Sequence, residues 1–103
     1  MRVTFTGAGP TTSQSFAVTD GASHWQQQNW TLYVSGTFGA TGSLQLQVSP
    51  DPRETTDANS RWFNQGAAIT TLGAPTQMAL RFRKLRYVFT GGDGTTSLVA
   101  EVV

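Results

Sequence analysis

The sequence predicts an all-β protein, a single small antiparallel β-sandwich or barrel with about seven or eight short strands. Three observations support this fold class. Short segments alternate apolar and polar side chains with a period of two, which is typical of strands with one buried face. Glycine and proline separate these segments at close intervals. No stretch has the apolar spacing of an amphipathic helix.

The expected strands follow the alternating segments in order along the chain. Their spacing is typical of Ig-like and jelly-roll-like sandwiches. The segments are Val3–Thr6, Gln14–Val18, Trp30–Thr37, Ser43–Ser49, Arg61–Phe63, Met78–Arg83, Arg86–Thr90 and Ser97–Val103.

The two central segments have the clearest apolar faces. Trp30, Leu32 and Val34 share one side of the first segment. Leu44, Leu46 and Val48 share one side of the second, with glutamines on the other. The link between them contains three glycines, which suits a tight turn, so we expect these two strands to pair with each other.

The last quarter of the chain predicts a further hairpin. The segments before and after Gly91-Gly-Asp-Gly94 both alternate, and glycine-rich turns commonly join paired strands. Within the first of these segments the apolar parity changes between Phe82 and Leu85. A bulge, a bend or a strand break at Arg83-Lys84 would each explain this change of face.

Length and composition favour one domain over residues 1–103. Cysteine is absent, so disulfides and thiolate metal sites are excluded. The formal net charge is +1, which disfavours electrostatic binding to nucleic acid or to an anionic membrane. No apolar stretch suits a secretory leader or a membrane span, so we expect a protein made in the cytoplasm and not secreted.

The residues that could carry chemistry are few, and we expect no enzyme. His24 is the only histidine and lies in a polar loop without a nucleophile motif, which favours an exposed or locally bonded imidazole. Asp20, Asp51 and Asp93 sit beside glycine or proline, where turn carboxylates are common. Asp51, Glu54 and Asp57 lack the spacing of an EF-hand. We therefore predict no metal and no cofactor.

Two groups of residues are candidate interface residues. The first is the basic run that contains Arg81, Arg83, Lys84 and Arg86, interleaved with aromatic and aliphatic residues. Such a run could form a platform for single-stranded nucleic acid, but a solvated strand face or a subunit contact fits the low net charge better. The second group consists of tryptophans outside the central strands, Trp25 and Trp62, which could anchor a protein interface or stack on sugar rings.

Two segments of the sequence, Val34–Asp51 and Leu85–Val103, resemble small virion proteins of tailed bacteriophages. In that family a strand ending in Gly-Thr-Phe-Gly, here residues 36–39, leads to a strand that ends in Ser-Pro-Asp, here residues 49–51. A later strand with Leu-Arg and Thr-Gly turns into a closing Thr-Ser-Leu-x-Ala-Glu strand, here residues 96–101. The resemblance covers about a third of the chain and rests on structural residues. The chain departs from the family pattern at Pro52, where many members have glycine.

The resemblance implies a β-sandwich component of a phage particle, most directly a capsid decoration, or cement, protein. Such a protein would bind the outer capsid surface and stabilise the shell by contacts with the major capsid protein or other virion proteins. The resemblance transfers no functional residue. We also expect a homo-oligomer, with a trimer as the natural form on a local threefold axis, and neither a membrane nor a nucleic acid as partner. A tail, neck or fibre-associated protein and a carbohydrate-binding module that uses exposed tryptophans are the alternatives.

Overall fold

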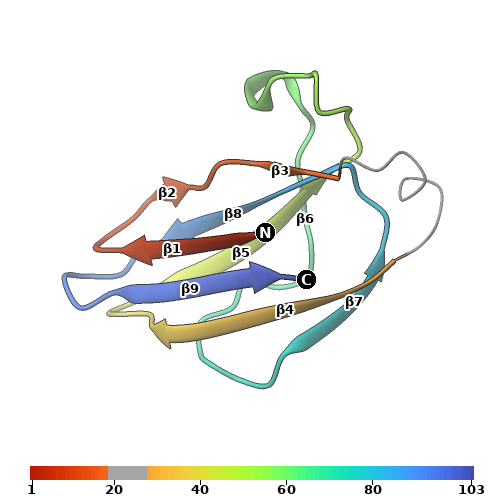
Figure 1. The fold of residues 1–103 in the computed structure, drawn as a ribbon. Coiled ribbons are helices and arrows are strands. Elements are labelled where there is room, and N and C mark those ends of the chain that lie inside the picture. The colour runs from red at the N-terminus through yellow and green to blue at the C-terminus, as the bar shows by residue number, and fades with distance from the viewer. Residues whose placement is uncertain (19–27) are drawn as a thin grey trace.

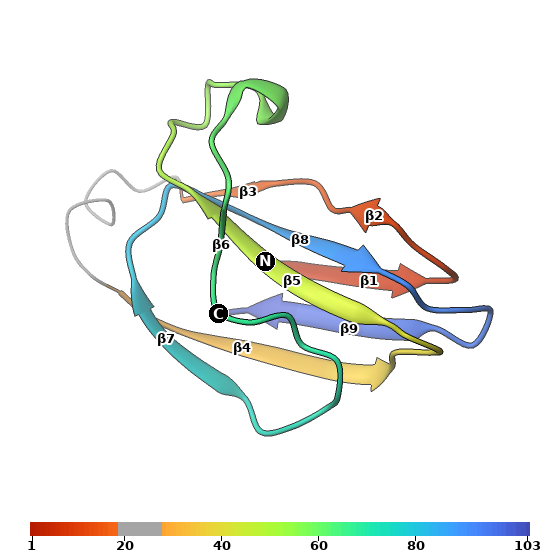
Figure 2. The ribbon, with the colours of Figure 1, turned by 180° about the vertical axis from the view of Figure 1, so that it is seen from behind.

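A computed structural model describes residues 1–18 and 28–103 and forms a β-sandwich of two antiparallel sheets (Figure 1). Sheet A has the strand order β1-β9-β4-β7, and in sheet B β8 lies between β5 and the short strands β2 and β3, with β6 next to β5. The two sheets face each other without closing into a barrel, as the view from behind also shows (Figure 2). The strands are β1 (Arg2–Thr6), β2 (Thr11–Thr12), β3 (Phe16–Ala17), β4 (Gln28–Thr37), β5 (Ser43–Ser49), β6 (Phe63–Asn64), β7 (Thr76–Leu80), β8 (Lys84–Thr90) and β9 (Ser97–Val102).

The predicted all-β sandwich is therefore confirmed, and the expected strands lie close to observed ones. The prediction for Ser43–Ser49 coincides with β5, and the faces of the central strands are as expected. Leu32, Leu44 and Leu46 are almost fully buried. The sequence analysis missed β2, a two-residue strand of exposed threonines without apolar alternation.

The predicted pairing of the two central strands is wrong. β4 pairs with β9 and β7 in sheet A, whereas β5 pairs with β8 and β6 in sheet B. The link between them crosses from one sheet to the other, and Phe38 within it is 8% exposed. Because Phe38 anchors the link in the core, the glycines serve a crossover between layers and not a hairpin turn.

The predicted C-terminal hairpin is wrong for the same reason. β8 lies in sheet B and β9 in sheet A, so the link at residues 91–96 also crosses between the sheets. The two crossovers bind each other at one end of the sandwich: the Gly92 amide donates to the Ala40 carbonyl at 2.8 Å, and Thr96 Oγ1 donates to the Phe38 carbonyl at 2.9 Å. A Cβ on Gly39 would lie 2.4 Å from Thr96 Oγ1, so this contact requires glycine.

The change of apolar parity before Leu85 is a strand break, one of the three devices that the sequence left open. β7 ends at Leu80 in sheet A and β8 begins at Lys84 in sheet B. Phe82, between them, is 6% exposed and packs against Trp30 with ring centroids 4.9 Å apart. The core lies between the sheets; its largest fully buried hydrophobic side chains are Tyr87, Phe89, Leu44, Leu85, Leu98 and Val102.

Tyr87 joins the two sheets through a polar contact inside this core. Its side chain is fully buried, and its hydroxyl donates to the Met1 carbonyl at 2.6 Å. Burial raises the pKa of the Tyr87 phenol, so the group stays protonated and available as a donor. The first and last strands lie side by side in sheet A, with the Val102 amide bonded to the same Met1 carbonyl (Figure 1).

Candidate binding surfaces

Asp51, Asp57 and Asp93 accept hydrogen bonds from other residues of the fold. Asp51 accepts a hydrogen bond at 2.8 Å from Arg61, which lowers the pKa of Asp51 to about 2. Asp57 accepts a hydrogen bond at 2.8 Å from Ser15. Asp93 accepts from the Thr95 side chain and backbone and from the Ala40 amide, and these bonds lower its pKa. These acids stabilise turns and loops, as the sequence suggested.

Over residues 1–18 and 28–103 no three histidine, cysteine or acidic side chains gather where they could hold a metal ion. Of the three acids compared with an EF-hand, Asp51 accepts a hydrogen bond from Arg61 and Asp57 accepts one from Ser15. His24 and Trp25 lie outside the described residues. The predicted absence of catalysis therefore stays a prediction.

The structure divides the basic run into two groups. Lys84 and Arg86 belong to β8 and point to the outer side of sheet B, under the loop Pro50–Trp62. Lys84 is 1% exposed, and its ammonium donates to the Thr55 carbonyl at 2.7 Å, to Ser60 Oγ and, at 3.5 Å, to Asp57. Lys84 thus offers almost no surface to a partner, which the charged sequence pattern could not reveal.

Arg81 and Arg83 form the second group, in the break between β7 and β8. Arg81 is exposed and Arg83 is half-buried, beside a hollow of about 190 Å³ that Pro50 and Phe82 also line. Among the four predicted basic interface residues, these two therefore have the side chains best placed for a partner.

Trp62 is half-buried and partly covered by the chain itself. The Arg86 guanidinium lies 4.1 Å from the centroid of the indole ring, and the indole N–H donates to the Asp57 carbonyl at 3.0 Å. Burial lowers the pKa of Arg86, which also donates to Gln47 at 2.8 Å. Because one ring face of Trp62 is occupied, this residue is less suited to stacking on sugar than an open tryptophan would be.

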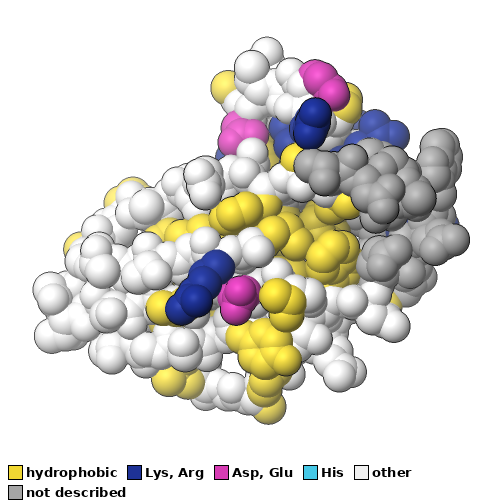
Figure 3. All heavy atoms as spheres, in the orientation of Figure 1, with side chains coloured by type: hydrophobic (Ala, Val, Ile, Leu, Met, Phe, Trp, Pro, Cys, Tyr) yellow, Lys and Arg dark blue, Asp and Glu magenta, His cyan; other side chains and the backbone are white. Residues whose placement is uncertain are grey.

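The outer face of sheet A carries an exposed apolar patch around Tyr33, a residue that the sequence analysis did not single out. Tyr33 is 47% exposed and Val103 is 57% exposed. Tyr33 lies opposite Glu101 in the pairing of β4 with β9, and Arg2 lies opposite the same glutamate in β1. Figure 3 shows hydrophobic side chains here beside one basic and one acidic group, on a face that is otherwise mostly uncharged. The outward position of Tyr33 on its strand was the available signal.

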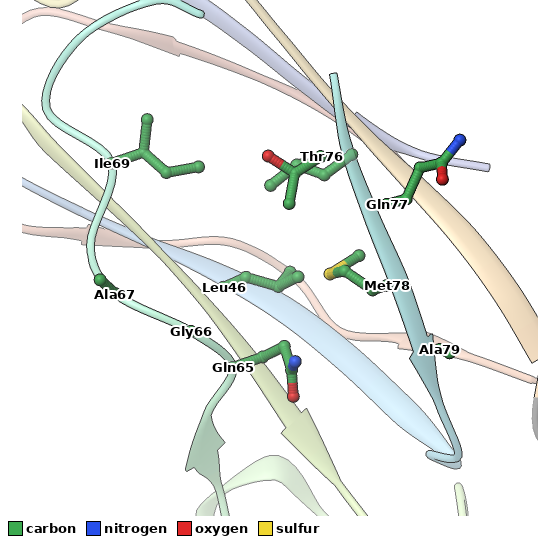
Figure 4. Close-up of a pocket in the computed structure, with 10 residues that line it drawn as sticks. Leu46, Gln65, Gly66, Ala67, Ile69, Thr76, Gln77, Met78 and Ala79 are labelled. Carbon is green, nitrogen blue, oxygen red and sulfur yellow. The ribbon is translucent and has the colours of Figure 1, made fainter. Parts of the chain in front are cut away.

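A groove follows one open side of the sandwich, between β7 of sheet A and the segment that follows β6 of sheet B (Figure 4). Its larger part has a volume of about 350 Å³, and a neighbouring part of about 110 Å³ shares Leu32, Ile69 and Thr76 with it. Leu46 and Met78 point into the same space as Ile69 and Thr76, whereas Gln77 points away. This combination of residues far apart in sequence could not be predicted from strand patterns alone.

No protein-family model, curated protein or solved structure matches this chain. In the part of the chain that the structure describes, no helix is long and apolar enough to cross a membrane.

Proposed function

We propose that this chain is a structural virion protein of a tailed bacteriophage, a capsid decoration protein that binds the outer capsid surface and stabilises the shell by protein–protein contacts. The virion setting rests on the sequence resemblance of residues 34–51 and 85–103. The proposed mode of action, non-covalent binding to a partner protein, rests on the geometry of the surfaces described above.

The observation that carries the proposal is the outer face of sheet A. Tyr33 and Val103 are about half exposed on a hydrogen-bonded sheet, so a partner could cover them without ordering a loop. Protein interfaces are enriched in tyrosine and depleted in charge at their centres, and this face has one basic and one acidic group beside the patch. The exposed Arg81 and the half-buried Arg83 provide a separate cationic contact.

A decoration protein repeats one contact at many symmetry-related positions on a shell. A modest affinity at each position therefore gives a large total stabilisation. A rigid sandwich is suited to this function, because repeated contacts require the same geometry in every copy.

Co-sedimentation of the purified protein with capsids that lack it tests the proposal. Bound copies are counted against the major capsid protein. We expect saturable binding at a fixed ratio. An absence of binding to capsids, together with binding to isolated tails or fibres, would replace the capsid assignment with the tail alternative, and an absence of binding to every particle would overturn the proposal.

Matched variants locate the contact. Tyr33→Ser removes the exposed aromatic ring from sheet A, and Phe63→Ser removes a ring of similar exposure, 53%, from the edge of sheet B. We expect Tyr33→Ser to weaken capsid binding about tenfold, the effect of a central aromatic anchor. Phe63→Ser should leave binding unchanged; the opposite result would move the contact to sheet B.

A further inference from the structure

We infer that the groove beside β7 binds an extended, uncharged peptide segment of a partner protein, which pairs with the free backbone edge at Ala68 and Thr70 and places alternate apolar side chains in the groove. The inference does not depend on the capsid assignment, because it rests on the groove and on the backbone beside it.

The first support is the shape of the sandwich at this side. Leu32 and Leu46 form the floor of the groove, and both are almost completely buried core residues. Ile69 and Met78 stand on opposite walls and are only half-buried. The core is therefore open here, and an apolar side chain that entered the groove would extend it.

The second support is the backbone of the segment after β6. Ile69 exchanges two backbone hydrogen bonds with Leu44 of β5, each 2.8 Å long. Among the described residues, no hydrogen bond links Ala67, Ala68 or residues 70–75 to another part of the chain. In an extended chain, successive residues direct their amide and carbonyl groups to opposite sides. Since Ile69 faces β5, the groups of Ala68 and Thr70 face the open edge.

An extended peptide is the occupant that matches both features. It would pair its own backbone with Ala68 and Thr70, as in the addition of a strand to a sheet edge. Its alternate side chains on one face lie about 6.6 Å apart, so consecutive inward side chains can enter the two neighbouring parts of the groove. A compact apolar ligand could fill the groove but would leave the backbone edge without a partner.

The charges of the groove define the chemistry of the peptide. Every side chain that lines its two parts is uncharged, and the polar side chains at the larger part are Gln65, Thr76 and the outward-pointing Gln77. A charged side chain buried there would lose its hydration without gaining an ion pair. The residues that enter the groove are therefore aliphatic and their neighbours neutral.

A library of randomised seven-residue peptides displayed on a carrier tests the inference, with the full chain as the immobilised target. Ala67 lines the groove, whereas Ala68 beside it does not. Ala67→Trp should fill the groove, and Ala68→Trp is the matched control with the same added ring. We expect enriched peptides with aliphatic residues at alternate positions and no charge, and an affinity about tenfold weaker for Ala67→Trp than for Ala68→Trp.

Amide hydrogen exchange of the wild-type chain provides a measurement that needs no variant. An enriched peptide, synthesised with capped ends, should slow the exchange of Ala68 and Thr70, which have no hydrogen-bond partner in the free chain. Failure to enrich any peptide, equal binding to the two tryptophan variants, enrichment of charged peptides, or unchanged exchange at Ala68 and Thr70 would each overturn the inference.

Discussion

Two segments on either side of β6 differ in how the fold holds them. The loop Pro50–Trp62 is fixed to sheet B by Lys84 and Ser15 and is closed on itself by the Asp51–Arg61 ion pair, 2.8 Å long. The segment at residues 66–75 contacts β5 mainly through the backbone bridge at Ile69. Of the two, only the first contains charged residues.

This difference indicates that the loop Pro50–Trp62 stabilises the fold, whereas residues 66–75 are available to a partner. In the first loop, Asp57 is hydrogen-bonded to Ser15, just before β3, and Thr55 and Ser60 are hydrogen-bonded to Lys84 of β8. These polar groups therefore have partners within the chain. Residues 67–75 contain no charge, and within this range only the backbone of Ile69 is hydrogen-bonded to another part of the described chain. The contrast can be tested by substitutions that we expect to have very unequal effects.

Among substitutions that test how the two segments are held, the largest effect should come from Lys84→Ala. The substitution removes three hydrogen bonds from a side chain that is almost fully buried, and it leaves the Thr55 carbonyl without its donor. We expect the free energy of unfolding to fall by about 3 kcal/mol in urea titrations. Arg53→Ala in the same loop is the control, since Arg53 is exposed and lies 3.9 Å from Glu54. Equal effects of the two variants would show that the loop is not anchored by Lys84.

A smaller effect is expected for Ser15→Ala. Its hydroxyl donates to Asp57 at 2.8 Å and joins the chain before β3 to the loop. A hydrogen bond to a charged acceptor contributes more than a neutral one, and we expect a loss of about 1 kcal/mol in the same titrations. Ser35→Ala, on the exposed face of sheet A, should change the free energy of unfolding by less than about 0.5 kcal/mol. A loss for Ser35→Ala as large as for Ser15→Ala would contradict the assignment.

The anchoring of the loop also shows where sequence analysis ends. Period-two patterns located most strands and their buried faces, because burial of one face depends on residues close in sequence. They could not show that β4 and β5 belong to different sheets, since a glycine-rich link suits a hairpin and a crossover equally well. Phe38 decides between them by packing into the core, a contact between distant residues.

The same limit applies to the candidate sites. In sequence the four basic residues between Arg81 and Arg86 look alike, yet Lys84 is buried under a loop 24 to 29 residues away, to which its ammonium donates hydrogen bonds. Tyr33 was visible as an outward residue of a predicted strand, but its exposure depends on neighbouring strands that pair across the sheet. The groove requires the edges of both sheets to be known.

Acid should loosen the closed loop before it unfolds the sandwich. Arg61 lowers the pKa of Asp51 to about 2, below the value of about 3.9 for an unfolded aspartate. The contribution of this ion pair is therefore complete above pH 4 and is lost as the pH falls from about 4 to 2. In urea titrations at pH 4, 3 and 2, Asp51→Asn should show a smaller decline in stability than the wild type. Identical declines would mean that Asp51 and Arg61 do not stabilise the folded state.

The smallest effect is expected in the open segment. Leu72 is 51% exposed, so its replacement by serine removes little buried apolar surface. We expect Leu72→Ser to change the free energy of unfolding by less than about 0.5 kcal/mol, whereas Leu85→Ala, at a fully buried position of β8, should lower it by about 3 kcal/mol. A loss above about 1 kcal/mol for Leu72→Ser would mean that the segment packs as firmly as the anchored loop. A small loss leaves this edge as the part of sheet B that can accept a partner without giving up contacts of its own.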